Sequence, residues 1–239
     1  MKTWITFQGV QITRLLSGRC NCHLIQGEDG FLLVDCGGRH SRKKLRRRLI
    51  ALGIGRDGPL TLVLTHTHFD HAENAAALRR EFNARTIVHE TEAHNLKRGE
   101  NPLIRGTNPF LRFLIRLGER SKVMARMGYT GTAADLTVND RYDLRPLGFP
   151  AVIIHTPGHT GGSTSVIADN EIALVGDTLF GIFPGSAFPP FAQDPPQLVN
   201  SWGRLLDTRC TLYLPAHGRA RTRALLLRRY KKYREKFGS

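Results

Sequence analysis

The feature that most restricts the fold of this 239-residue chain is a short segment, THTHFDHAEN, that begins at Thr65. It follows directly on the apolar run 61–64, which is typical of a buried strand. Four of the six positions after Thr65 carry side chains that bind transition metals in proteins. These are His66, His68, Asp70 and His71. The chain must therefore fold so that a buried strand ends at a polar edge.

This crowding predicts two neighbouring ions rather than one. His66 and His68 are two residues apart in an extended segment, so both imidazoles can point to the same side and hold one ion. Asp70 and His71 come at the turn into the next helix and point in another direction. We therefore expect one strand end to serve two adjacent metal sites.

Two sites need more ligands, and the rest of the chain carries three at comparable places. His159 lies in HTPGHTGGS just before a predicted strand, Asp177 follows the apolar run 172–175, and His217 follows the run 212–214. The fold must bring these distant strand ends to one edge. The other histidines lack such a position, and we interpret them as structural or surface residues: His23, His40, His89, His94 and His155.

The pattern along the chain predicts an α/β protein. Apolar and alternating runs predict strands at 10–16, 22–26, 30–34, 60–64, 86–89, 142–144, 151–155, 163–168, 171–175 and 211–214. Helices are expected to about 52, from the histidine cluster through 80, from about 196 to 206, and from about 219 to 237, with a helical insertion at about 97–134. No change in composition indicates a linker. We therefore expect one domain, 1–239, with two sheets packed face to face and helices outside.

Composition limits the compartment and the partners. No apolar stretch approaches the roughly 20 residues of a membrane-spanning helix, and the N-terminus lacks the features of a signal peptide, so we expect a cytoplasmic protein. Cys20 and Cys22 share one face of a predicted strand, and we interpret them as buried thiols rather than a soft-metal pair. The net charge of +15 is concentrated in GRHSRKKLRRRL and in the C-terminal helix. These basic faces are either solvated surfaces or sites for nucleic acid or an anionic surface.

The seven candidate ligands, in their order, resemble the signature of the metallo-β-lactamase-fold hydrolase superfamily. That signature is His-x-His-x-Asp-His, followed by a His, a bridging Asp and a final His. The resemblance spans about residues 9–218 and includes NCHLI and LLVDCGG in the early strands. It implies a four-layer αββα sandwich (the metallo-β-lactamase fold) with the metals at one edge of the sheets.

The resemblance also implies a role for each residue. His66, His68 and His159 would bind the first ion, Asp70, His71 and His217 the second, and Asp177 would bridge the two. We expect two divalent ions, zinc in the first place, with iron or manganese as alternatives. Asp35 is expected to be a structural hydrogen-bonding residue near the site rather than a ligand.

Such a centre predicts hydrolysis. Two ions sharing a water lower its pKa toward about 7, and the resulting hydroxide can attack a carbonyl or phosphoryl centre while the other ion polarises the oxygen. Asp70 is the expected catalytic residue, which would orient the hydroxide or pass a proton to the leaving group. No serine or cysteine nucleophile is indicated by a motif.

The sequence leaves three classes of enzyme to choose from: hydrolases of acyl compounds, nucleases or phosphodiesterases, and iron-dependent dioxygenases. GDTLF and THTHFDH resemble glyoxalase II-type thioesterases, although the segment that holds glutathione in that family is replaced here by GIFPGSAFPPF. Acyl-homoserine lactonases are also similar, but their Tyr three residues after the bridging Asp is Phe180 here. We expect a thioesterase, lactonase or esterase acting on a small acyl substrate. The alternatives are a nuclease or phosphodiesterase, which the charge favours, and an iron-dependent persulfide dioxygenase.

Aromatic residues predict an apolar substrate pocket beside the metals. The insertion would fold over the metal edge, and the loop after Asp177 would add a stiff wall rich in proline. The expected wall residues are Phe110, Phe113, Phe180, Phe183 and Phe188.

Overall fold

The computed structural model describes the whole chain except residues 29, 57, 104–105, 108–127 and 238–239. Its strands are β1 (Lys2–Ile5), β2 (Gln11–Leu16), β3 (Cys22–Gln26), β4 (Phe31–Val34), β5 (Leu60–Val63), β6 (Arg85–His89), β7 (Leu136–Val138), β8 (Arg141–Asp143), β9 (Ala151–His155), β10 (Thr164–Ala168), β11 (Ile172–Gly176), β12 (Leu212–Pro215) and β13 (Arg221–Thr222). Its α-helices are α1 (Arg42–Ala51), α2 (Phe69–Ala72), α3 (Ala75–Phe82), α4 (Glu90–Arg98), α6 (Pro195–Asp207) and α7 (Arg223–Phe237).

The described strands form two mixed sheets. The first has the order β1-β2-β3-β4-β5-β6-β7, antiparallel up to β4 and parallel from β4 to β7. The second has the order β13-β12-β11-β10-β9-β8, in which only the β11–β12 pair is parallel. Each half of the chain thus runs from antiparallel strands into parallel strand–helix units.

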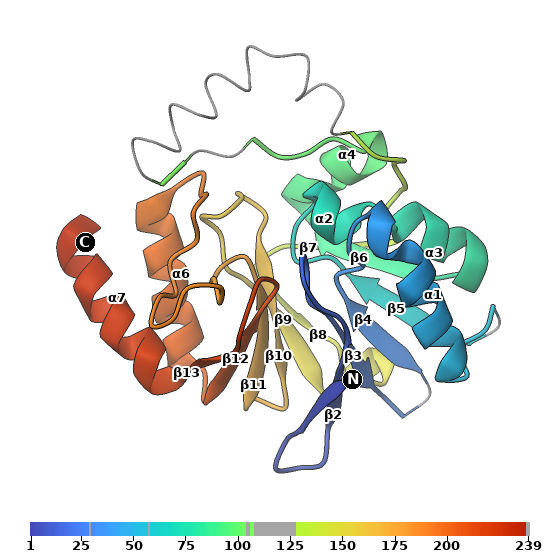
Figure 1. The fold of residues 1–239 in the computed structure, drawn as a ribbon, viewed down its shortest axis with the longest axis horizontal. Helices are drawn as coiled ribbons and strands as arrows, with labels where there is room; N and C mark the ends of the chain where they lie inside the picture. Colours follow the sequence, from blue (N-terminus) through green and yellow to red (C-terminus); the bar gives the residue numbers. More distant parts are fainter. Residues whose placement is uncertain (29, 57, 104–105, 108–127, 238–239) are drawn as a thin grey trace.

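Side-chain alternation along the strands divides the buried residues into three apolar layers. In β5, Leu62 belongs to the core under α1 and α3, whereas Val63 belongs to the core between the sheets. In β9, Ile153 faces the first sheet and Ile154 faces the outer helices of the second. Strands buried on both faces require cover on both sides. The result is the αββα sandwich that the sequence predicts, with α1 and α3 outside one sheet and α6 and α7 outside the other (Figure 1).

The candidate ligands follow strands that end at the same edge of the sandwich. The segment 66–71 comes after β5, Asp177 comes after β11, and His217 comes two residues after β12. β11 and β12 are parallel neighbours, so their carboxyl ends lie side by side. His159 stands in the turn between β9 and β10. This edge is at the top of Figure 1, next to α2 and α4.

The structure corrects several of the predicted elements. The helix expected through residue 80 is broken between α2 and α3, because Asn74 Nδ2 donates to the carbonyl oxygens of residues 36–38 at 2.9–3.0 Å. β1, β7 and α4 are additional, and the basic C-terminal helix begins at Arg223 rather than at 219, because Arg221 and Thr222 pair with β12. Most of the expected insertion, 108–127, lies outside the described residues.

The helices within the described part of the chain are too short or too polar to cross a membrane.

Candidate metal centre

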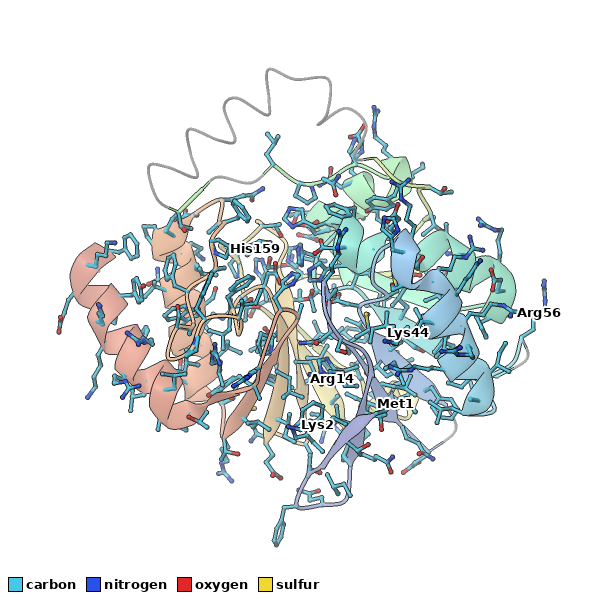
Figure 2. All side chains as sticks on the ribbon, viewed as in Figure 1. Met1, Lys2, Arg14, Lys44, Arg56 and His159 are labelled. Atoms are coloured by element: carbon cyan, nitrogen blue, oxygen red, sulfur yellow. The ribbon has the colours of Figure 1, made fainter. Side chains whose placement is uncertain are left out.

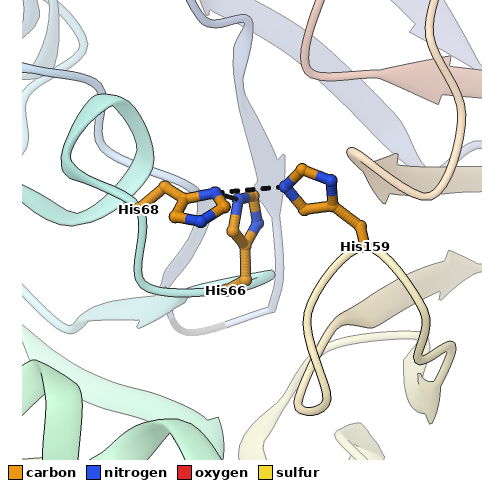
Figure 3. Close-up of side chains that lie close together, drawn as sticks. All are labelled: His66, His68 and His159. Atoms are coloured by element: carbon orange, nitrogen blue, oxygen red, sulfur yellow. Dashed lines mark hydrogen bonds between the residues drawn. The ribbon is translucent and has the colours of Figure 1, made fainter. Parts of the chain in front are cut away.

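Three histidines converge at one end of the sandwich. His66 Nε2 lies 2.8 Å from His68 Nδ1, and His159 Nε2 lies 3.1 Å from the same His68 nitrogen. His66 and His68 come from the loop after β5, whereas His159 reaches in from the second sheet (Figure 3). Figure 2 also shows His159 between the two halves of the molecule. We call these three residues the first metal group.

A second group lies beside the first. The ligand atoms of Asp70, His71 and His217 all lie within 4.8 Å of one another. His217 Nε2 is 3.4 Å from Asp70 Oδ2, and His71 Nε2 is 3.9 Å from Asp70 Oδ1. The ring centroids of His71 and His66 are 4.0 Å apart, so the two groups are adjacent. We call these three residues the second metal group.

Asp177 stands between the two groups. Its Oδ1 lies 3.3 Å from His217 Nε2 and 3.5 Å from His71 Nε2, and its Oδ2 lies 3.5 Å from His159 Nε2. Each oxygen therefore faces a different group. The structure brings together all seven residues that the sequence selected.

The polar atoms at the centre of this arrangement fit divalent cations. His71 Nε2 and Asp177 Oδ1 are buried without a hydrogen-bond partner among the described residues. A buried polar atom without a partner is costly, and a cation between these atoms would satisfy both. Imidazole nitrogens with carboxylate oxygens are the donor set of zinc and related ions.

The opposite nitrogen of several rings is held by an acceptor, which leaves the inward nitrogen free to bind. His71 Nδ1 lies 2.9 Å from Asp35 Oδ2, His159 Nδ1 lies 2.9 Å from the carbonyl oxygen of Phe191, and His68 Nε2 lies 3.2 Å from that of Pro102. An N–H donated outward determines which nitrogen carries the lone pair for a metal. Asp35 thus takes the supporting position expected of it, with its other oxygen accepting from the Thr65 backbone N–H.

Burial and charge act differently on the two groups. Burial lowers the pKa of His66 and His68, and neighbouring imidazoles lower it further, so both rings stay neutral as metal binding requires. Burial alone would lower the pKa of His217, but the Asp177 carboxylate outweighs it and raises that pKa. Burial would raise the pKa of Asp177, but the adjacent histidines hold it well below its usual range.

The backbone around the centre depends on close contact between the sheets. The Thr164 N–H donates to the carbonyl oxygen of Thr65 at 2.8 Å, which joins the start of β10 to the loop after β5. Gly176, directly before Asp177, has φ +50°, and a Cβ there would lie 2.5 Å from Thr65 Oγ1. Only glycine permits both the conformation and the approach.

A pocket of about 380 Å³ opens onto Asp70 and His217 of the second group, onto His68 and His159 of the first, and onto Asp177. Its wall is largely aromatic and proline side chains. It is lined by His68, Phe69, Asp70, Asn101, Pro102, His159, Asp177, Phe180, Pro189, Pro190, Phe191 and His217.

The predicted wall residues have different outcomes. Phe180 lines the pocket, whereas Phe183 lies outside its lining with its ring 6.3 Å from that of Phe180. Phe188 is not among the lining residues of this pocket: its ring stacks on that of Tyr233 at 4.4 Å and meets that of Trp202 at 5.6 Å, within the contact between α6 and α7. Phe110 and Phe113 lie outside the described residues.

Some lining residues were not in the predicted wall. Asn101 and Pro102 reach the pocket from the start of the expected insertion, and Asn101 Oδ1 accepts from the Phe69 N–H at 2.7 Å. Phe69 lies between His68 and Asp70 in the sequence, and this position next to two candidate ligands could have identified it as a pocket residue. Nothing local in the sequence indicates the Asn101 contact, because it joins residues 32 positions apart.

Comparison with known families matches residues 17–217 to the metallo-β-lactamase superfamily. The chain belongs to this superfamily. An uncharacterized protein of Mycobacterium leprae is 30% identical over 217 residues, covering 85% of this chain and 88% of that protein. The hydroxyacylglutathione hydrolase GloC of Haemophilus influenzae is 27% identical over 175 residues, covering 72% of each. The family and such names indicate a metal-dependent hydrolase.

Solved structures agree on the fold. A metallo-β-lactamase family protein of Thermus thermophilus superposes with a TM-score of 0.67 at 21% identity, covering 94% of this chain and 80% of that one. A subclass B3 metallo-β-lactamase of Bradyrhizobium japonicum gives 0.65 at 17% identity, covering 95% and 89%. The resemblance noted in the sequence is therefore confirmed for the family and for the sandwich.

Proposed function

We propose that this superfamily member is a dinuclear-metal hydrolase that cleaves a carboxylic ester, thioester or lactone. The observation that carries the proposal is the convergence of seven ligand-type side chains at one edge of the sandwich, five of which line an apolar pocket. His66, His68 and His159 would hold one ion, Asp70, His71 and His217 the other, and Asp177 would face both. When bound, the ions would lower the pKa of a water and polarise the oxygen under attack.

The chain's own residues would position the substrate and move the proton. Asp70 is the acid of the second group that lines the pocket, and 21% of its side chain is exposed. It can therefore accept a proton from water and return it to the leaving group. Phe180, Phe191 and Pro190 would surround the acyl group and exclude water from the reacting bond.

The acyl substrate class rests on the pocket wall. Aromatic rings and prolines favour an uncharged carbon chain over a phosphodiester backbone. A further support is that relatives at 24–27% identity are named hydroxyacylglutathione hydrolases, which are thioesterases. We expect zinc in both positions, with iron or manganese as alternatives.

A series of aryl esters, thioesters and lactones with acyl chains of increasing length tests this proposal in the presence of defined metals. Each methylene that enters the pocket is worth about 0.8 kcal/mol, so kcat/KM should rise about fourfold per carbon over the first few carbons. A flat series with measurable phosphodiesterase turnover would contradict the ester assignment. Metal analysis is the second readout, because a single bound iron would favour oxygen chemistry instead.

A nuclease or other polyanion-binding role is the second candidate, and the outer face of α7 is the observation in its favour. Its exposed side chains include Arg228, Lys231, Lys232, Arg234 and Lys236, with Glu235 as the single acid among them. Binding to DNA, RNA or anionic vesicles should then fall steeply with salt through counterion release. Affinity that stays flat from low to physiological salt, or no binding at all, would indicate a solvated face.

A further inference from the structure

A buried carboxylate that belongs to neither metal group lies behind the first one. Glu92, in the first turn of α4, is 2% exposed. Its Oε2 accepts hydrogen bonds from both the backbone N–H and the hydroxyl of Thr67, the former at 3.1 Å. Thr67 is the residue between His66 and His68.

All three polar groups of Thr67 are held from outside its own loop. Besides the two donors that Glu92 accepts, the Thr67 carbonyl oxygen accepts from the Tyr129 hydroxyl at 2.9 Å. Thr67 itself is fully buried. The peptides on either side of Thr67 carry the two histidines, so these contacts determine the direction of both imidazoles.

The same carboxylate also contacts the loop that carries His159. A Cβ on Gly162 would lie 2.4 Å from Glu92 Cγ and 3.1 Å from Glu92 Oε1, so the absence of a side chain there makes room for the glutamate. Glu92 is thus wedged where the His66–His68 loop and the His159 loop meet. No comparable contact reaches the second metal group among the described hydrogen bonds of Glu92.

We propose that Glu92 is a positioning residue for the first metal group, which sets the spacing of His66, His68 and His159 through Thr67 and Gly162. This inference rests on the proposed metal-binding function. Hydrogen bonds to a carboxylate are about twice as strong as neutral ones, and removal of supporting groups behind metal ligands typically lowers metal affinity about 10–100-fold. The effect is specific to one site, because the second group is supported by Asp35 instead.

The test is Glu92→Gln, which keeps the shape and removes the charge. We expect the dissociation constant of the first metal to rise at least about tenfold, while that of the second metal stays within about twofold. Competition with a chromophoric chelator measures both constants. The d–d spectrum of the cobalt-substituted protein should change at the first site alone, and the Thr67 amide of the metal-free protein should exchange its hydrogen faster.

Glu90→Gln is the matched control, because Glu90 lies in the same first turn, is exposed and accepts from Asn139 rather than from the ligand loop. It should leave both constants unchanged. Thr67→Val removes the hydroxyl donor without touching the carboxylate, and it should weaken the first metal in the same way if Glu92→Gln folds poorly.

Equal first-site affinity in Glu92→Gln, Thr67→Val and the wild type would overturn the inference, and so would an equal loss at both sites with a lower Tm. A wild-type protein that binds no metal would instead overturn the proposed function itself, so the two failures are distinguishable.

Discussion

The two sheets supply the metal-competent residues in different ways. The first sheet supplies four of them from six consecutive positions after β5, whereas the second supplies three from separate strand ends. Yet each metal group combines both sheets: His159 completes the first group and His217 the second. The difference teaches that a contiguous motif is not sufficient to form the centre. Both metal groups form only because the two sheets pack close together at this edge, and bound ions would link the two sheets.

The sharpest way to test this joint dependence is Asp177→Ala. Asp177 comes from the second sheet and is the single residue among the seven whose two oxygens face different groups. Without this carboxylate, less negative charge would balance the positive charge of the two ions. We therefore expect the affinity for both metals to fall at least about 100-fold, and activity to be lost in parallel. Metal analysis after dialysis measures the result. A variant that keeps one metal at full affinity would show that the groups are independent.

His71→Ala and His217→Ala compare the two sheets within one group. Both residues belong to the second group but come from opposite sheets, so both variants should retain about one ion and lose the other. His68→Ala is the matched change in the first group. Unchanged metal content in His71→Ala and His217→Ala would contradict the assignment of the second site.

Removing the ions should loosen the contact between the sheets. A ligand present at about 100 times its dissociation constant stabilises the native state by about 2.7 kcal/mol. Chelation should therefore lower Tm, and added zinc should restore it. Hydrogen exchange should rise mainly at the joined edge, where the Thr164 N–H donates to Thr65. An unchanged Tm would mean that the sheets hold together without the ions.

The first sheet also carries a buried histidine away from the site, which predicts an acid sensitivity independent of metal. Burial, together with the neighbouring Arg14, lowers the pKa of His23 to about 3. The unfolded chain therefore binds this proton more readily, and stability falls as pH drops from about 6.5 toward 3. At pH 5 the loss is about 2 kcal/mol.

In His23→Gln, the free energy of unfolding should fall less steeply as the pH drops below about 6.5. Urea unfolding of the metal-free protein at several pH values measures this. His40→Gln, at an exposed position, is the control. If the free energy of unfolding depends on pH equally in both variants, His23 is not the cause of the acid sensitivity.

Much of the fold was predictable from local pattern. Strands such as β3 and β9 have the predicted bounds, because a short apolar run between polar or turn residues is typical of a strand that is buried on both faces. α4 was missed because its helical face is short and merges into the insertion. The break before α3 was missed because it depends on the contacts of Asn74 with residues 36–38, which are distant in sequence.

The sequence by itself determined the donor set, because the ligand types and their places at strand ends are local properties of the chain. It also determined the family, since order and spacing carry that signal. Only the tertiary structure decided which side chains converge at the candidate metal centre and which support them from outside. Phe188 packs between helices rather than in the pocket, and Glu92 holds Thr67 from another element. Both depend on how far apart two elements lie after packing, and that distance is set by the summed contacts of both sheets rather than by any segment alone.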